Sequence, residues 1–305
     1  MLTGIDLFAG AGGTTTGAKA AGVNVIWAAN HNPTAVEFHA KNHPEVAHEC
    51  QDLHQANWAS VPKHDITYAS PACQGHSRAA GKKKFEKKAD VSRSTAWAVV
   101  SCLEVHQTEI AIIENVEDFL VWRLYKPWEA ALHALGYSLS LNLINASDLG
   151  VPQNRLRLFI VATRSKHPIE LKLDTQQHVP ARSFIDLNPA GYKWDLVENR
   201  VPATQRRVAN GRKQFGDILL DAAYGSAKSG RSIDKPLGTV TTVNKHSLVI
   251  EDKIRPLSIR EQAAAQTFDD SYLWPDSAVT TKMMIGNAVP PLMAQRVTEA
   301  VLKAV

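Results

Sequence analysis

A cysteine in the stretch ASPACQGHS has the surroundings of a nucleophile. Cys73 comes shortly after the apolar run Ile66–Ala69, which predicts a strand. Ligands of α/β proteins bind at the sheet edge where such strands end, and the basic residues that follow Cys73 would favour its thiolate. A structural cysteine lies more often inside a strand or on a helix face, as we expect for Cys102. Cys73 is therefore predicted to be a catalytic nucleophile.

A carboxylate and a set of alternating polar residues occupy comparable places. Glu114 follows the apolar run 110–113, where it either faces a ligand or marks the exit of the strand into solvent. Gln153, Arg155 and Arg157 alternate along the chain, so an extended backbone would project them from one face. They either bind an anionic or hydrogen-bonding ligand, or they form a polar rim of the strand.

The N-terminal sequence DLFAGAGG predicts a strand end, a glycine turn and a helix start. Gly10, Gly12 and Gly13 lack the G-x-G-x-x-G spacing of dinucleotide sites, and the next strand ends in AANHN, without a carboxylate. An adenosyl cofactor without a pyrophosphate therefore fits better than a nicotinamide cofactor. The alternative is a tight turn with no ligand.

Basic residues are concentrated in two segments of a nearly neutral chain, whose formal net charge is +4. Residues 78–93 hold seven basic and two acidic side chains, and residues 200–213 hold five basic side chains and no acidic one. Such clusters indicate a polyanion partner, although two solvated loops would have the same composition.

Apolar runs alternate with helical patterns over the first half of the 305 residues. We expect strands at 2–9, 23–29, 65–69, 109–113, 137–144 and 156–163, and helices at 14–21, 33–41, 91–106 and 127–135. This order predicts an α/β fold with a mostly parallel sheet flanked by helices. No apolar run is long enough to span a membrane, no signal peptide is evident, and three cysteines make no disulfide framework, so we expect a cytoplasmic protein.

The composition changes after Arg164, where turn residues and scattered charges become frequent. We therefore expect one domain over residues 1–165 with 281–305, and a smaller domain over 166–280. The smaller domain should contain a short strand at 238–243 and a helix at 258–267, which Ser258 and Glu261 begin with a capping box.

Taken in order, these motifs resemble those of the DNA (cytosine-5) methyltransferases over nearly the whole chain. DLFAGAGG is similar to the first cofactor motif, SPACQGHS to the Pro-Cys loop, Glu114-Asn115-Val116 to the Glu-Asn-Val motif and QNRLR to Gln-x-Arg-x-Arg. RPLSIREQAAAQTF and GNAVP resemble the ninth and tenth motifs. The resemblance implies a Rossmann-like methyltransferase of prokaryotic or phage type, with residues 166–280 as a target-recognition domain.

The resemblance also implies which residues act. Catalysis would involve Cys73, Glu114, Asn115, Gln153, Arg155 and Arg157. The Cys73 thiolate would add to C6 of a flipped cytosine, a protonated Glu114 with a raised pKa would bind N3, Arg157 would hold O2, and Arg155 would support the thiolate or its loop. S-adenosyl-L-methionine would bind to Phe8, Gly10, Gly12, Gly13, Asn30, His31, Asp52, Leu53, Pro71 and Asn287. No metal is implied.

Double-stranded DNA would be the partner, which places the protein on the nucleoid. DNA contacts would come from Gln74, Ser77, Arg78, Lys82, Lys83, Lys84, Arg93, Arg206, Arg207 and Arg212. A cognate restriction endonuclease is a further partner that the resemblance allows, and we expect a monomer, with a dimer as the alternative.

Two positions depart from the family pattern. Ala72 stands before the cysteine where a proline is usual, which predicts a less rigid loop, and Asn30 replaces the acid that commonly holds the ribose, which predicts weaker cofactor binding. A tRNA cytosine-5 methyltransferase on the same core is an alternative, but its Cys-Phe-Thr signature is absent between Arg164 and Arg255. A catalytically silent DNA-binding regulator is another, but such proteins tend to lose the cysteine or the glutamate.

Overall fold

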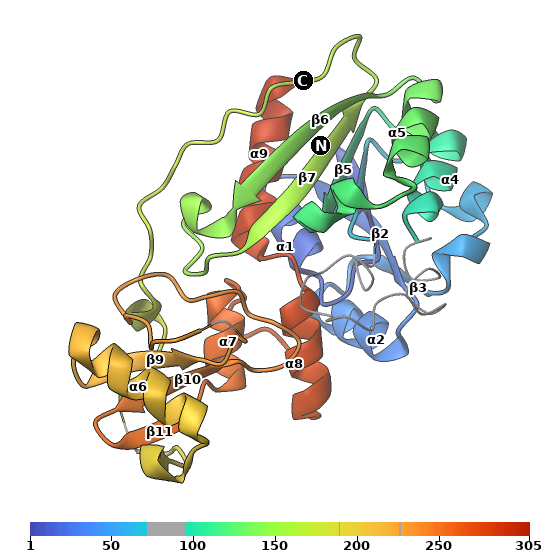
Figure 1. Cartoon of the computed structure of the whole chain (residues 1–305). Coiled ribbons are helices and arrows are strands. Elements are labelled where there is room, and N and C mark those ends of the chain that lie inside the picture. Colours follow the sequence, from blue (N-terminus) through green and yellow to red (C-terminus); the bar gives the residue numbers. More distant parts are fainter. Residues whose placement is uncertain (72–94, 189, 226) are drawn as a thin grey trace. The chain divides into compact units, whose positions relative to one another are not determined.

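The computed structural model describes residues 1–71, 95–188, 190–225 and 227–305 (Figure 1). The chain forms two compact units. The first comprises Met1–Asn145, Leu156–Asp174 and Ala288–Val305, and the second comprises Ala146–Arg155 and Thr175–Asn287. These limits differ by several residues from the expected ones, because the loop 146–155 and residues 281–287 pack with the second unit. The assignment of catalysis and target recognition to these parts remains a prediction.

A seven-stranded sheet forms the centre of the first unit. Its strands are β1 (Thr3–Leu7), β2 (Asn24–Asn30), β3 (Ala47–Cys50), β4 (Ile66–Ala69), β5 (Ile110–Asn115), β6 (Ser138–Asn145) and β7 (Leu156–Thr163). They lie in the order β3-β2-β1-β4-β5-β7-β6, and only β7 runs antiparallel to both of its neighbours. The predicted α/β fold with a mostly parallel, Rossmann-like sheet is confirmed.

Helices cover both faces of this sheet, as Figure 1 shows. They are α1 (Gly13–Ala20), α2 (Pro33–Asn42), α4 (Ala96–His106), α5 (Tyr125–Ala134) and α9 (Pro291–Ala304). Ile5 and Leu7 of β1 belong to the apolar core under α4 and α5. Because side chains alternate along a strand, Asp6 points to the other face, where Thr15 of α1 donates to it.

Helix α9 packs against α1 at a point with no room for a side chain. A Cβ atom at Gly17 would lie 2.3 Å from the carbonyl oxygen of Pro291 and 2.6 Å from Cβ of Ala294. The glycine therefore allows the C-terminal helix to approach the helix that follows the glycine turn.

The second unit is built on a four-stranded antiparallel sheet. Its strands are β8 (Asp195–Leu196), β9 (Ile218–Ala222), β10 (His246–Ile250) and β11 (Lys253–Pro256), and its helices are α6 (Pro202–Phe215), α7 (Ile259–Ala265) and α8 (Ala278–Asn287). Val208 of α6 packs on Leu219, Val249 and Ile254 of the sheet.

Two local expectations have different outcomes. The capping box of α7 is confirmed, since Ser258 accepts from the Glu261 amide and Glu261 accepts from the Ser258 amide. The expected strand at 238–243 is wrong, because Val240 uses its amide and its carbonyl for the side chains of Gln153 and Arg155 instead of a neighbouring strand. None of the helices in the described ranges is long and apolar enough to cross a membrane.

A buried ion pair links α7 to the second sheet. The Glu261 carboxylate accepts hydrogen bonds from Nη2 and Nη1 of Arg255, at 2.7 and 2.8 Å, and from the Asp186 amide, at 3.0 Å. The ring of Tyr192 lies 3.9 Å from the Arg255 guanidinium. The two charged side chains are only 1% and 3% exposed, so neither has water as an alternative partner.

We predict that Glu261→Gln lowers the free energy of unfolding of the second unit by roughly 3–5 kcal/mol, because it leaves the Arg255 charge buried and unpaired. Urea unfolding followed by hydrogen-exchange mass spectrometry of β11 and α7 would measure the loss. Asp270→Asn is the matched control, because Asp270 pairs with Arg260 in solvent and its loss should change little. Equal stability of the two variants would contradict the prediction.

Candidate active site

The glycine turn follows β1 and contains three residues in the left-handed region. Phe8 has φ 62°, Gly10 has φ 55° and Gly12 has φ 86°. Glycine adopts such angles without a penalty, but Phe8 is strained by them. The Gly12 amide donates to Ala9 O at 2.8 Å within the turn, and the Ala9 amide donates to Ala29 O at 3.0 Å, which holds the turn to β2.

The other cofactor candidates of the first unit follow neighbouring strands. Asn30 ends β2 and is half-buried, and its Oδ1 accepts from the Asn32 amide at 2.9 Å. Asp52 follows β3, and its Oδ1 accepts from the His54 amide at 3.0 Å. His31 is exposed, and Leu53 and Pro71 are buried. Asn287 is exposed at the end of α8 and belongs to the second unit.

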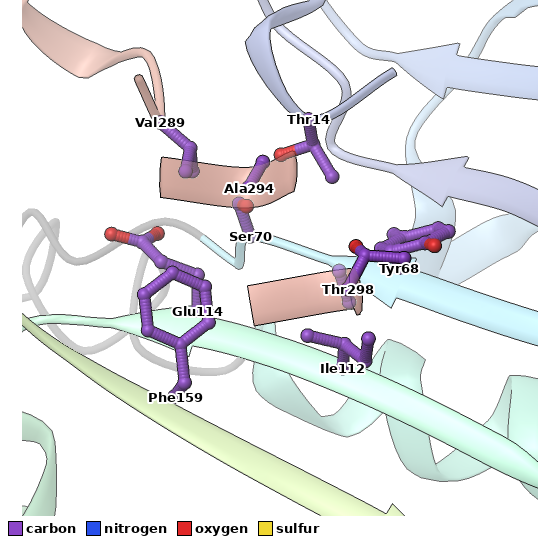
Figure 2. Close-up of a pocket in the computed structure, with 10 residues that line it drawn as sticks. Thr14, Tyr68, Ser70, Ile112, Glu114, Phe159, Val289, Ala294 and Thr298 are labelled. Atoms are coloured by element: carbon purple, nitrogen blue, oxygen red, sulfur yellow. The ribbon is translucent and has the colours of Figure 1, made fainter. Parts of the chain in front are cut away.

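A pocket of the first unit lies at the ends of β4 and β5 (Figure 2). Its lining comes from five elements or their flanks and consists of Thr14, Tyr68, Ala69, Ser70, Ile112, Glu114, Phe159, Val289, Ala294 and Thr298. Figure 2 shows Glu114 and Phe159 together on one wall, which agrees with their pairing across β5 and β7. Of this set, only Glu114 has a role predicted from the sequence, although Ser70 and Val289 lie within the SPACQGHS and GNAVP motifs. Phe159 could have been predicted from the sequence, because it follows Arg157 by two residues and therefore lies on the same face of the strand.

Glu114 and Arg157 form an ion pair at this pocket. Arg157 Nε lies 3.0 Å from Glu114 Oε1, and the two side chains are 15% and 14% exposed. Since Glu114 faces Phe159, Arg157 is its diagonal neighbour on the same face of the sheet. The structure therefore brings together two of the predicted catalytic residues, a carboxyl group and a guanidinium, beside a small pocket.

Asn115 points to the other face of β5 and is buried. Its Nδ2 donates to Pro71 O at 3.3 Å, while its Oδ1 accepts from the Val116 amide at 2.9 Å. Pro71 precedes Cys73 by two residues. Asn115 therefore fixes the described end of the chain segment that leads to the predicted nucleophile.

Gln153 and Arg155 lie in the second unit and are 0% and 2% exposed. Gln153 donates to Ala265 O and accepts from the Val240 amide. Arg155 donates at 3.0 Å to the carbonyls of Val240 and of Gly286. The expected shared strand face is wrong for these two residues, because β7 begins only at Leu156. Their bonds hold three segments of the second unit together.

Most of the predicted DNA contacts lie outside the described residues, as does the predicted nucleophile Cys73. These contacts are Gln74, Ser77, Arg78, Lys82, Lys83, Lys84 and Arg93. On α6, Arg206 is exposed, Arg212 is half-buried and donates to Glu251 O, and Arg207 is buried. Arg207 binds both oxygens of Asp221, at 2.6 and 2.8 Å, so its guanidinium is engaged inside the unit. Among the described residues, no group of three His, Cys, Asp or Glu side chains could hold a metal ion.

We predict that Arg207→Met destabilises the protein by roughly 3 kcal/mol, because it leaves Asp221 buried without its cation. Arg206→Met is the matched control one position earlier on α6, and it should leave the midpoint of unfolding unchanged. Thermal unfolding by circular dichroism would compare them. A loss of stability in the Arg206 variant alone would contradict the described orientation of α6.

Comparisons with known proteins identify the family of the chain. Residues 2–303 match the C-5 cytosine-specific DNA methylase family. Type II methyltransferase M.AplI of Arthrospira platensis is 30% identical over 314 residues, which cover 99% of this chain and 86% of that protein. Type II methyltransferase M1.HphI of Haemophilus parahaemolyticus is 26% identical over 339 residues, which cover 99% and 87% of the two chains.

Solved structures show the same fold. A DNA modification methyltransferase encoded within an E. coli prophage superimposes with a TM-score of 0.73 at 18% identity, over 100% of this chain and 99% of the other. A mutant of Spodoptera frugiperda DNMT2 superimposes with a TM-score of 0.70 at 19% identity, again over 100% and 99%. With a family match that spans nearly every residue, the chain belongs to the C-5 cytosine-specific DNA methylases and is a DNA cytosine-5 methyltransferase.

Proposed function

We propose that this enzyme methylates C5 of a cytosine that is flipped out of double-stranded DNA, at a specific sequence, through a covalent bond between Cys73 and C6. The observation that carries the proposal is the Glu114–Arg157 pair, which faces a pocket at the strand ends. Pro71 is tied to Asn115, the neighbour of Glu114. Two residues of chain reach at most about 7 Å, and this short link from Pro71 supports a nucleophile that acts near the carboxyl group.

The chemistry requires a carbon nucleophile at C5, which an unmodified cytosine does not offer. Addition of the Cys73 thiolate to C6 forms the S–C6 bond and moves the C5–C6 electron pair to C5. A protonated Glu114 at N3 neutralises the charge that develops on the ring. S-adenosyl-L-methionine, when bound, supplies the methyl group to C5. Loss of the C5 proton to a water then expels the Cys73 thiolate and restores the ring.

The Glu114–Arg157 pair suits a binding site for a polar ring. Each side chain satisfies the charge of the other. A cytosine offers the same two partners in exchange, because its N3 and exocyclic amine suit the carboxyl group and its O2 suits the guanidinium. A carboxyl group that carries a proton donates to cytosine N3 and accepts from the exocyclic amine, whereas thymine and uracil present an N3–H donor and an O4 acceptor in those places, and this supports selectivity for cytosine.

The glycine turn suits an adenosyl cofactor. A Cβ at Gly10 would meet only Phe8 O, at 3.7 Å, so space remains next to the backbone and the positive φ is what requires glycine. Asn30 already uses its oxygen to accept from Asn32, so it would offer Nδ2 as a donor to the ribose hydroxyls. The Asp52 carboxylate would accept from the adenine amine. His31, Leu53 and Pro71 complete the proposed set in the first unit.

Sequence recognition is assigned to the second unit, where α6 presents Arg206 to solvent. Extrusion of the base costs a few kcal/mol, which contacts from the basic residues 78–93 to phosphates would offset. The names of the relatives support a restriction-modification setting, with a cognate endonuclease as partner. We propose a monomer that acts on chromosomal DNA in the cytoplasm.

We predict that Cys73→Ala abolishes methylation, and that Glu114→Gln slows it by about a hundredfold or more, because the amide cannot donate a proton towards N3. Mass spectrometry of nucleosides would measure 5-methylcytosine after incubation of unmethylated genomic DNA with S-adenosylmethionine. Bulk tRNA, incubated in parallel, tests the tRNA alternative. Methylation by the Cys73 variant would refute the covalent mechanism, and product in tRNA alone would reassign the substrate.

We predict that Asn115→Ala lowers kcat by about ten- to a hundredfold while the affinity for S-adenosylmethionine stays the same, because it frees Pro71 from the site. Single-turnover kinetics and calorimetric titration would separate the two quantities. Asn42→Ala is the matched control, since it removes an amide that donates to Phe38 O in α2. An equal loss of rate in both variants would mean that Asn115 has only a general structural role.

A further inference from the structure

A chain of buried hydrogen bonds runs from the glycine turn towards the surface of the first unit. Thr15 Oγ1 donates to Asp6 Oδ2 at 2.7 Å, and His39 Nε2 lies 3.1 Å from Thr15 Oγ1. His39 Nδ1 lies 2.7 Å from His48 Nε2. Asp6, Thr15 and His39 are at most 1% exposed, and His48 is half-buried. None of these residues has a role in the proposed chemistry.

The direction of each bond follows from the donors that are present. The hydroxyl of Thr15 has one proton, which Asp6 receives, so His39 Nε2 has to donate to Thr15. Burial, assisted by His43, His48 and Lys19, lowers the pKa of His39 to about 2, so the ring is neutral. Its Nδ1 is then an acceptor, and His48 Nε2 donates to it. Every bond therefore points towards Asp6, the one acceptor at the inner end.

The inner bond of this chain spans the glycine turn. Asp6 lies in β1, two residues before Phe8, and Thr15 lies in the first turn of α1, two residues after Gly13. Their bond joins the two limbs of the turn, and His39 of α2 fixes the Thr15 hydroxyl from the other side. The position of the turn thus depends on an acceptor at Asp6.

We propose that the chain Asp6–Thr15–His39–His48 positions the glycine turn for the cofactor, and that ionised Asp6 is the form that binds the cofactor tightly. This inference rests on the proposed cofactor site at the turn. Ionised Asp6 is only an acceptor, so every hydrogen bond of this series is donated in the direction of Asp6. Protonated Asp6 is able to donate, and it then competes with the Thr15 proton and weakens the link across the turn.

The groups around Asp6, other than Thr15, do little to stabilise its negative charge. Its Oδ1 is buried without a hydrogen-bond partner in the described part of the chain. Tyr68 of β4 is the register partner of Asp6, and Thr298 of α9 interacts with Tyr68. Burial raises the pKa of Asp6 to about 7, against the opposing effect of Thr15. At the outer end, Lys19, His43 and Glu45 surround His39 and His48.

The sign of the pH effect follows from this raised pKa. The stability contributed by protonated Asp6 is present below pH 4 and is lost as the pH rises through about 7. Above a pH of about 7 the folded protein therefore carries an unfavourable buried charge at Asp6. If the cofactor binds the ionised form better, its affinity rises as the pH increases through about 7, opposite to the trend in stability.

Calorimetric titration of the whole protein with S-adenosylmethionine between pH 6 and 8.5 would test the proposal. We expect the affinity of the wild-type protein for S-adenosylmethionine to rise at least about fivefold from the lowest to the highest pH. This rise is counted in addition to any change with pH that the variants also show. Thr15→Val should bind more weakly at pH 8 and lose this additional slope, and Thr15→Ser, which keeps the hydroxyl, should restore both. The titration of the ligand itself is common to all variants and cancels in the comparison.

Thr67→Val is the matched control, because Thr67 is also fully buried and its hydroxyl also contacts a histidine, His64, at 2.9 Å. It should lose stability but keep the wild-type affinity and slope. If Thr15→Val does not fold, His48→Gln at the partly exposed end should show a smaller change of the same sign. The proposal would be overturned if Thr15→Val or His48→Gln bound the cofactor with the wild-type affinity and the wild-type dependence on pH. Wild-type protein that binds no cofactor at any pH would instead overturn the proposed cofactor site.

Discussion

A helix contact that tolerates no side chain organises the first unit. Gly17 lets α9 approach α1 so closely that an added Cβ would lie 2.3 Å from a carbonyl oxygen. With α9 in this place, Ala294 and Thr298 form part of the pocket that holds Glu114. The same contact fixes α1, whose first turn closes the glycine turn. The C-terminal helix therefore supports the glycine turn and the carboxyl group at once, although about 280 residues of chain separate it from the turn.

The sequence predicted the parts of the site that depend on strand ends. Parallel strands bring their carboxyl ends to one edge, so the residues after apolar runs meet there, and Glu114 and the glycine turn were found in this way. Side chains alternate along a strand, which means that Asp6 leaves the face that Ile5 and Leu7 occupy. This alternation could not indicate that α1 and α2 would supply Thr15 and His39, because these contacts depend on how the helices pack.

Other predictions failed where a polar side chain has a distant partner. Gln153 and Arg155 looked like a strand face, but the groups that bind them follow about 85 or more residues later. The same bonds prevent residues 238–243 from forming a strand, since Val240 is used by side chains. Sequence spacing describes what a residue could present on a strand. It does not describe which remote backbone groups bind that residue instead. In the second unit, such bonds determine the positions of Gln153 and Arg155.

The second unit uses arginine as an internal structural group, and this limits what charge in a sequence can indicate. Arg155, Arg207 and Arg255 are each less than a tenth exposed, and they bind carbonyl oxygens, Asp221 and Glu261. A guanidinium suits this role because its five donors lie in a fixed plane and remain charged when buried. The basic cluster on α6 therefore overstates the positive surface available to DNA. Since Arg207 faces inwards, the neighbouring Arg206 points outwards on the same helix, and the helical period rather than the number of charges determines which residues a phosphate can reach.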